Sequence, residues 1–318
     1  MDSFWRLSLY SKNYTKVLIL LCTLSLLSAC ALKRESPSQE QLIRKSYISQ
    51  LNNQERDYFL YLPKGYFSEP DKKWPVMMFL HGNGERGNGK DELDFVLKHG
   101  PVYQAWIQKQ DLPFIIISPQ LHMFDFDQRG IGYIDNRKYS DIPQRQTQGT
   151  PPSVESRPQN PIIRAPSLQD MSEISPLLPL GWDKVELDLI NILSEVSTNY
   201  DVNKNKTYLT GLSYGGFGTW FMASQYPNKF AAIAPVVGWG HPDLMQAIAA
   251  EQLPIWQFAG GLDNAVEIQY FYAGIEKLRE LGHNEVRFTV HEDMGHDAWK
   301  RVYASSDFYE WLLSHSLK

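Results

Sequence analysis

The chain has 318 residues, 43% of them hydrophobic, and a formal net charge of −5 at pH 7. This length and apolar content support one sizeable buried core and require no more than one or two domains. No run of lysines and arginines could follow a phosphate backbone, which excludes nucleic acid as a partner. A small neutral or amphiphilic ligand fits the composition better.

Residues 1–29 have the pattern of an export signal. A basic segment precedes the apolar run 17–27, which is too short to span a bilayer comfortably as a permanent helix. The run ends in Leu27-Ser28-Ala29-Cys30, which resembles the lipobox of bacterial lipoproteins. The resemblance implies cleavage before Cys30 and acylation of this residue with diacylglycerol and palmitate. The alternatives are an ordinary signal peptide with a chance cysteine and an uncleaved anchor.

Lipidation at Cys30 would leave the mature chain without a disulfide, because the other cysteine, Cys22, lies in the discarded run. Two or three acyl chains suffice for stable membrane anchoring. Ala31 stands where lipoproteins of the inner membrane typically carry Asp. The resemblance therefore implies an anchor in the outer membrane, facing the periplasm of a bacterial cell envelope. The sequence does not indicate an oligomeric state.

Residues 30–54 are polar and predict a tether, so the folded domain is expected over 55–318. Residues 58–62 predict an early antiparallel strand that ends at a Pro-Lys-Gly turn. The fully apolar runs 76–80 and 114–117 are typical of strands buried on both faces of a parallel sheet.

Strands and helices then alternate along the chain. Residues 183–200 show the apolar spacing of one helical face, with Asp183 and Glu186 as a possible capping box. This order predicts an α/β fold with a mostly parallel sheet, helices on both faces and ligands at the carboxyl ends of the strands. The later strands are expected at 207–210, 231–237, 255–258 and 286–290, and the later helices at 215–226, 266–281 and 298–313.

A long Pro-rich insertion, residues 121–181, interrupts this alternation of strands and helices and shows no sustained apolar periodicity. Loops of this length inside a compact domain are usually functional lids or disordered excursions. Residues 123–126 are aromatic enough to pack near a site. The sequence leaves a lid and a flexible surface insertion as alternatives.

Gly211-Leu212-Ser213-Tyr214-Gly215 matches G-x-S-x-G between a predicted strand and a predicted helix. In that context the serine sits on a sharp turn and its Oγ points into the cleft as a nucleophile. A serine hydroxyl needs a base to take its proton and a carboxylate to orient that base. The alternative is a Gly-rich turn with an incidental Ser.

Asp263 and His296 are the candidates for these two roles. Each lies in a loop at the carboxyl end of a predicted strand, in the chain order Ser, Asp, His that this arrangement requires. The histidine lies in a Gly-His-Asp loop, which none of the rival histidines shares. The rivals are His241, His283 and His291 as base, and Glu267, Asp293 and Asp297 as acid.

The loop that follows the strand at 76–80 is rich in glycine, His81-Gly82-Asn83-Gly84-Glu85-Arg86-Gly87. An oxyanion hole takes one backbone N–H from the residue after the nucleophile, here Tyr214, and a second from this loop, Asn83 or Gly84. His81 is interpreted as a hydrogen-bonding residue that shapes the loop. Glu85 and Arg86 are interpreted as a local ion pair, with contact to the substrate as the alternative.

With these motifs, most of residues 55–313 resembles the polyhydroxybutyrate-depolymerase and feruloyl-esterase-like carboxylesterases of the α/β-hydrolase superfamily, a bacterial group often called predicted peptidases. Members commonly carry Met after the nucleophile, where this chain has Tyr214. The resemblance implies a catalytic domain that hydrolyses small-molecule esters through an acyl-enzyme, with no metal or organic cofactor. No H-E-x-x-H zinc motif is present in the sequence.

Two other functions are kept as alternatives. A serine peptidase of the prolyl-oligopeptidase type would use the same three residues on a different leaving group, although the chain has no room for a propeller gate. An envelope lipoprotein that reuses the fold for binding or scaffolding would need no catalysis.

Overall fold

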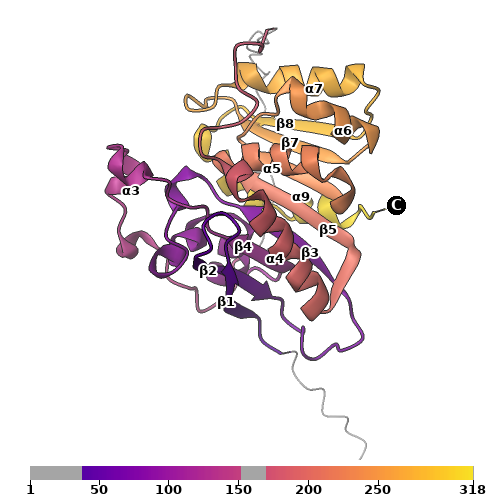
Figure 1. The fold of residues 1–318 in the computed structure, drawn as a ribbon. Coiled ribbons are helices and arrows are strands. Elements are labelled where there is room, and N and C mark those ends of the chain that lie inside the picture. The colour runs from indigo at the N-terminus through magenta and orange to yellow at the C-terminus, as the bar shows by residue number, and fades with distance from the viewer. Residues whose placement is uncertain (1–37, 152–169, 318) are drawn as a thin grey trace, which may run out of the picture. The chain divides into compact units, whose positions relative to one another are not determined.

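An eight-stranded sheet forms the centre of the part of the chain that the computed structural model describes, residues 38–151 and 170–317 (Figure 1). The strand order is β1-β2-β4-β3-β5-β6-β7-β8. Strand β2 is antiparallel to both of its neighbours, and β3 to β8 are parallel. The strands are β1 Gln41–Ile48, β2 Glu55–Leu62, β3 Trp74–Leu80, β4 Ile115–Pro119, β5 Val202–Leu212, β6 Ala232–Val236, β7 Ile255–Gly260 and β8 Val286–His291.

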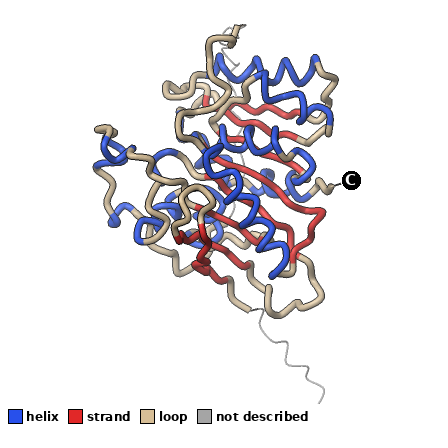
Figure 2. Tube along the Cα trace, viewed as in Figure 1, coloured by secondary structure: helices blue, strands red, loops and turns tan. Residues whose placement is uncertain are grey.

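Helices cover both faces of this sheet (Figure 2). Successive side chains of a strand point to opposite faces, so Met78 and Leu80 of β3 join one apolar cluster and Met77 and Phe79 join another. The first cluster includes residues of α4 Glu186–Asn199, α5 Tyr214–Gln225, α6 Met245–Ala250 and α7 Phe271–Glu280, and the second includes residues of α2 Gly100–Val102, α8 Trp299–Ala304 and α9 Ser306–Leu313. The expected α/β architecture is confirmed.

Strand β1 corrects the tether that the sequence predicted over 30–54. It pairs with β2 along its whole length, from Gln41 opposite Leu62 to Ile48 opposite Glu55. It is an edge strand whose residues alternate between exposed and half-buried. Because an edge strand needs few apolar residues and is often charged, here with Arg44 and Lys45, its composition is that of a linker. The folded unit therefore begins before residue 55.

Three local predictions about helices were wrong. The closing helix 298–313 is broken at Ser305, whose backbone is extended. The helix expected from residue 266 begins only at Phe271, after a 3-10 turn. No side chain caps α4, because a 3-10 turn, Trp182–Val185, precedes it and the Asp183 carboxylate pairs with Lys184, 2.8 Å away.

The described parts of the 121–181 insertion contain only short helical turns, among them α3 Gly132–Asp135. Residues 152–169, the predicted signal 1–29 and Cys30 lie outside the described residues. Within residues 38–151 and 170–317, no helix has the length and apolarity that crossing a bilayer demands.

Candidate active site

Ser213 occupies the sharp turn between β5 and α5. Its backbone has φ 52° and ψ −118°, a strained conformation that non-glycine residues rarely adopt. The turn is close-packed, since a Cβ added to Gly215 would lie 1.8 Å from the carbonyl oxygen of Leu80 at the end of β3. The glycines around the serine are therefore required for this turn, as the motif predicts.

The structure brings together the three side chains that the sequence singles out. Ser213 Oγ lies 3.0 Å from Nε2 of His296, and Nδ1 of His296 lies 2.7 Å from Oδ2 of Asp263. The three residues come from the loops after β5, β7 and β8, which meet because parallel strands end at one edge of the sheet. These distances suit transfer of a proton from the serine to the imidazole.

Asp263 is well placed to hold the imidazole. Its side chain is fully buried, and its Oδ1 accepts hydrogen bonds from the backbone N–H groups of Ala265 and Val266, 2.8 and 2.9 Å away. These bonds leave Oδ2 for His296 Nδ1. The carboxylate thereby selects the tautomer in which Nε2 is free to accept the serine proton.

The rival residues have other partners. Asp297 pairs with Lys300, and Asp293 forms a two-point ion pair with Arg301, so neither is the acid beside His296. The three rival histidines are buried. A ring nitrogen of His241 lies beside the backbone carbonyl of Met171, and one of His283 lies beside that of Leu253. Nδ1 of His291 faces Arg301. The remaining rival acid, Glu267, lines the cleft.

Ser213 and His296 line a cleft of about 800 Å³. One wall is aromatic: the Phe217 and Trp239 rings meet edge to face with centroids 4.9 Å apart, and Tyr270 stacks on Trp239 at 5.9 Å. Such a wall favours an apolar or aromatic part of a ligand.

The insertion contributes to this cleft from both of its described flanks. Tyr133 of α3 belongs to the first flank, and Ile174 and Leu178 belong to the second flank, which leads to α4. Phe126 meets the ring of Tyr214 edge to face, with centroids 6.2 Å apart, so the aromatic start of the insertion packs beside the serine turn as expected. Both described flanks of the insertion are therefore part of the cleft wall.

The loop after β3 lies against Ser213. A Cβ on Gly82 would lie 3.6 Å from Cβ of Ser213 and only 2.7 Å from a methyl carbon of Leu212, so the backbone approaches the turn as closely as glycine allows. Asn83, Gly84 and Tyr214 line the same cleft as Ser213. The residues predicted to form an oxyanion hole therefore line the same cleft as Ser213.

His81 shapes this loop from inside. Its side chain is fully buried, Nε2 accepts the backbone N–H of Leu121 at 2.9 Å, and Nδ1 donates to the carbonyl of Gly82 at 2.6 Å. The indole N–H of Trp182 donates to the carbonyl of His81 at 3.3 Å. Burial lowers the pKa of His81 to about 3, so the ring stays neutral and its two hydrogen bonds stay in place.

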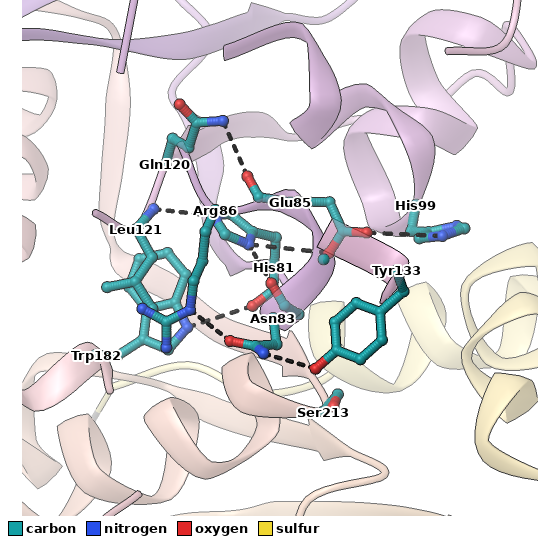
Figure 3. A network of polar contacts seen from close by, with 12 residues as sticks. His81, Asn83, Glu85, Arg86, His99, Gln120, Leu121, Tyr133, Trp182 and Ser213 are labelled. Carbon is teal, nitrogen blue, oxygen red and sulfur yellow. Dashed lines mark hydrogen bonds and ion pairs between the residues drawn. The ribbon is translucent and has the colours of Figure 1, made fainter. Parts of the chain in front are cut away.

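The ion pair expected between Glu85 and Arg86 does not form, because consecutive side chains of this turn point in different directions (Figure 3). Arg86 donates to Asn83 and to two carbonyls of the insertion. Glu85 instead lies 3.8 Å from Nε2 of His99 and lines the cleft. Burial raises the pKa of Glu85 to about 7.

Replacing Glu85 by glutamine is expected to stabilise the protein at pH 8 by about 3 kcal/mol and to change little at pH 4. A carboxyl whose pKa is raised on folding is favoured in its neutral form. Its contribution is therefore complete below the unfolded pKa, and the wild type loses it as pH rises towards 7. Urea unfolding of Glu85→Gln and wild type across this range measures the difference, and a gap that does not depend on pH would contradict it.

Comparisons with known proteins agree with the architecture. The model of the prolyl oligopeptidase family matches residues 182–249. Over 93 residues, 29% of this chain and 13% of the relative, the sequence is 30% identical to the bifunctional acetylxylan esterase/xylanase XynS20E of Neocallimastix patriciarum. Over 52 residues, 16% of the chain, it is 36% identical to poly(3-hydroxyalkanoate) depolymerase C of Paucimonas lemoignei, again covering 13% of the relative.

A solved structure of a thermostable esterase is similar over 86% of this chain and 63% of its own length, with a TM-score of 0.56 and 24% sequence identity. The matches thus span a small part of each curated relative and less than two thirds of that esterase. At this level of identity the likeness concerns the fold. Together with the sheet order and the serine turn between β5 and α5, it shows that the chain has the α/β-hydrolase fold.

Proposed function

We propose that this protein is a serine esterase that hydrolyses carboxylic esters through an acyl-enzyme intermediate. The observation that carries the proposal is the continuous hydrogen-bonded line from Ser213 through His296 to Asp263, at the wall of an open cleft. A binding or scaffolding protein would have no need of a strained serine backbone or of a buried carboxylate behind the imidazole.

The reaction follows from these positions. Ser213 Oγ attacks the ester carbonyl carbon while its proton passes to Nε2 of His296. The bond to the alcohol oxygen then breaks, and His296 returns the proton to that oxygen, which leaves the acyl group on the serine. A water molecule attacks the acyl-enzyme with its proton taken by His296, so that the carboxylic acid leaves and the serine hydroxyl is restored.

The negative charge that develops on the carbonyl oxygen needs fixed donors. The N–H groups of Tyr214 and of Asn83 or Gly84 are the proposed donors, because these residues line the cleft at Ser213. Tyr214 is the first residue of α5, where backbone N–H groups have no partner within the helix and where negative charge is favoured.

The match to the prolyl oligopeptidase family keeps a peptidase as the second candidate. The esterase is favoured because the relatives named as an acetylxylan esterase and a polyester depolymerase cleave esters. We expect the protein without its first 37 residues to hydrolyse p-nitrophenyl esters and to leave peptide p-nitroanilides intact. A specificity constant for an anilide equal to that for the best ester would support the peptidase instead.

We also propose that the protein is exported and anchored through a lipid on Cys30, in the outer membrane facing the periplasm. The support is the sequence of residues 1–30, in which an apolar run ends in Leu-Ser-Ala-Cys. Cells fed radiolabelled palmitate should label the wild type and not Cys30→Ala, and label that survives this substitution would reject the anchor.

A further inference from the structure

Arg86 is a buried cation without a carboxylate. Its side chain is fully buried, and within residues 38–151 and 170–317 no acidic side chain forms an ion pair with it. The guanidinium carbon instead lies over three aromatic rings, 4.1 Å from the centroid of Phe126, 4.8 Å from that of Tyr214 and 5.9 Å from that of Phe124. Burial lowers the pKa of Arg86 to about 10, which still leaves the group charged at neutral pH.

The donors of Arg86 reach three separate segments. Nε donates to Oδ1 of Asn83, Nη1 donates to the carbonyl of His122 at 3.0 Å, and Nη2 donates to the carbonyl of Leu180 at 2.9 Å. The last two residues stand at the start and the end of the insertion. One side chain thus joins the loop after β3 to both ends of the 121–181 segment.

Arg137 makes the reciprocal connection from the insertion to the loop. It follows α3, and its Nη1 donates to the carbonyls of Gly84, at 3.3 Å, and of Arg86. Its Nη2 forms an ion pair with Glu92. The backbone of the loop is therefore held by a side chain of the insertion.

Asn83 and Gly84 lie between these two anchors. The Asn83 side chain is held at both ends, because Oδ1 accepts from Arg86 and Nδ2 donates to the hydroxyl of Tyr133 at 2.7 Å (Figure 3). The next carbonyl along the chain, that of Gly84, is held by Arg137. The Asn83 side chain and the Gly84 carbonyl, which flank the peptide group between these two residues, are therefore both held by hydrogen bonds.

We propose that Arg86 and Arg137 are positioning residues that hold the N–H groups of residues 83 and 84 in place for the transition state of ester hydrolysis. The insertion, on this reading, is a support for the loop after β3. The proposal rests on the proposed esterase function. A buried cation without a carboxylate is costly to fold, and such groups are concentrated at functional sites.

The experiment compares Arg137→Met with wild type, using p-nitrophenyl butyrate as substrate and phenylboronic acid as inhibitor. The boronic acid forms a tetrahedral anionic adduct on the serine, so its affinity reports on the oxyanion donors. Loss of a whole donor lowers kcat by about 100- to 1,000-fold, and a displaced donor should cost about 10- to 100-fold. We expect kcat to fall by that factor, Ki for the boronic acid to rise in parallel, and KM to change by less than about threefold.

Arg86→Lys is the second variant, because lysine keeps the charge and cannot reach the three partners of Arg86 at once. It should likewise lower kcat and leave KM nearly unchanged. Should it fail to fold, Arg137→Met alone decides, since the Arg137 side chain lies nearer to solvent, with 7% exposed.

Two matched controls separate positioning from general stability. Glu92→Gln removes the ion pair of Arg137 and leaves its bonds to the two carbonyls possible. Arg129→Met removes an exposed arginine that lies over the same Phe126 ring, 4.4 Å from its centroid. Both should keep kcat and boronic acid affinity within about twofold of wild type, even where melting temperature falls.

Three outcomes would overturn the proposal. The inference alone fails if wild type hydrolyses the ester and Arg137→Met keeps the wild-type kcat. It also fails if Arg137→Met raises Ki for the boronic acid and KM by the same factor. It also fails if Glu92→Gln lowers kcat as much as Arg137→Met. A folded wild type that neither hydrolyses esters nor reacts with a fluorophosphonate would instead reject the esterase function, and this inference with it.

Discussion

Replacing Ser213 by alanine is expected to lower kcat by about 10⁴- to 10⁶-fold and to abolish labelling by a fluorophosphonate probe. The hydroxyl is the atom that would form the acyl-enzyme, and it lies 3.0 Å from the only imidazole nitrogen placed to take its proton within the described residues. The fold should be unaffected, because alanine removes one polar atom from the wall of an open cleft. Steady-state hydrolysis of a p-nitrophenyl ester and gel detection of the probe measure both effects.

Ser224→Ala provides the matched control for this variant. Ser224 is a half-buried serine of α5, the helix that follows Ser213, and its hydroxyl donates to the carbonyl of Phe221. Its loss should leave labelling intact. His296→Ala should cost about as much as Ser213→Ala, and the double variant little more, since the residues act as a unit. Probe labelling that persists in Ser213→Ala would place the nucleophile elsewhere.

Replacing Gly215 by alanine should give the largest loss of stability, about 3 kcal/mol or more. The added methyl carbon would lie 1.8 Å from the carbonyl oxygen of Leu80 and 2.4 Å from its carbonyl carbon, both backbone atoms of a buried central strand. Neither the strand nor the first turn of α5 can move without opening the sheet or displacing Ser213. Circular dichroism during thermal unfolding, together with soluble yield, measures the loss.

Gly132→Ala is the corresponding control. A methyl group at Gly132, in the first turn of α3, would lie 3.5 Å from the Asn136 amide, which is an ordinary contact. This variant should unfold at the wild-type temperature or slightly above it, because alanine favours a helix more than glycine does. A Gly215→Ala protein as stable as Gly132→Ala would mean that β3 and α5 are less closely packed than described.

The arrangement of the candidate site could largely be predicted because chain order and the parallel sheet together decide it. A residue that directly follows a buried parallel strand lies at one edge of the sheet, so Ser213, Asp263 and His296 could be expected near one another before any contact was known. Rivals failed for reasons that the local pattern does not contain. Asp297 and Asp293 form ion pairs with cations of α8, and the three rival histidines are buried.

The errors share a physical cause. Apolar periodicity reports which face of an element is buried, and β1 at the sheet edge buries too little to leave such a pattern. Adjacent charges indicate an ion pair, yet Glu85 and Arg86 leave the 3-10 turn in different directions and find separate partners. The break at Ser305 lets the residues on either side of it pack in one cluster, which an uninterrupted helical period cannot reveal.

The sequence by itself therefore determined the α/β architecture, the serine turn and the three side chains of the site, because each follows from short-range pattern and strand order. Only the tertiary structure decided what the insertion contacts and where Arg86 directs its donors. Those contacts join residues 36 and 94 positions apart, and hydrogen bonds between segments so distant depend on how the whole chain packs.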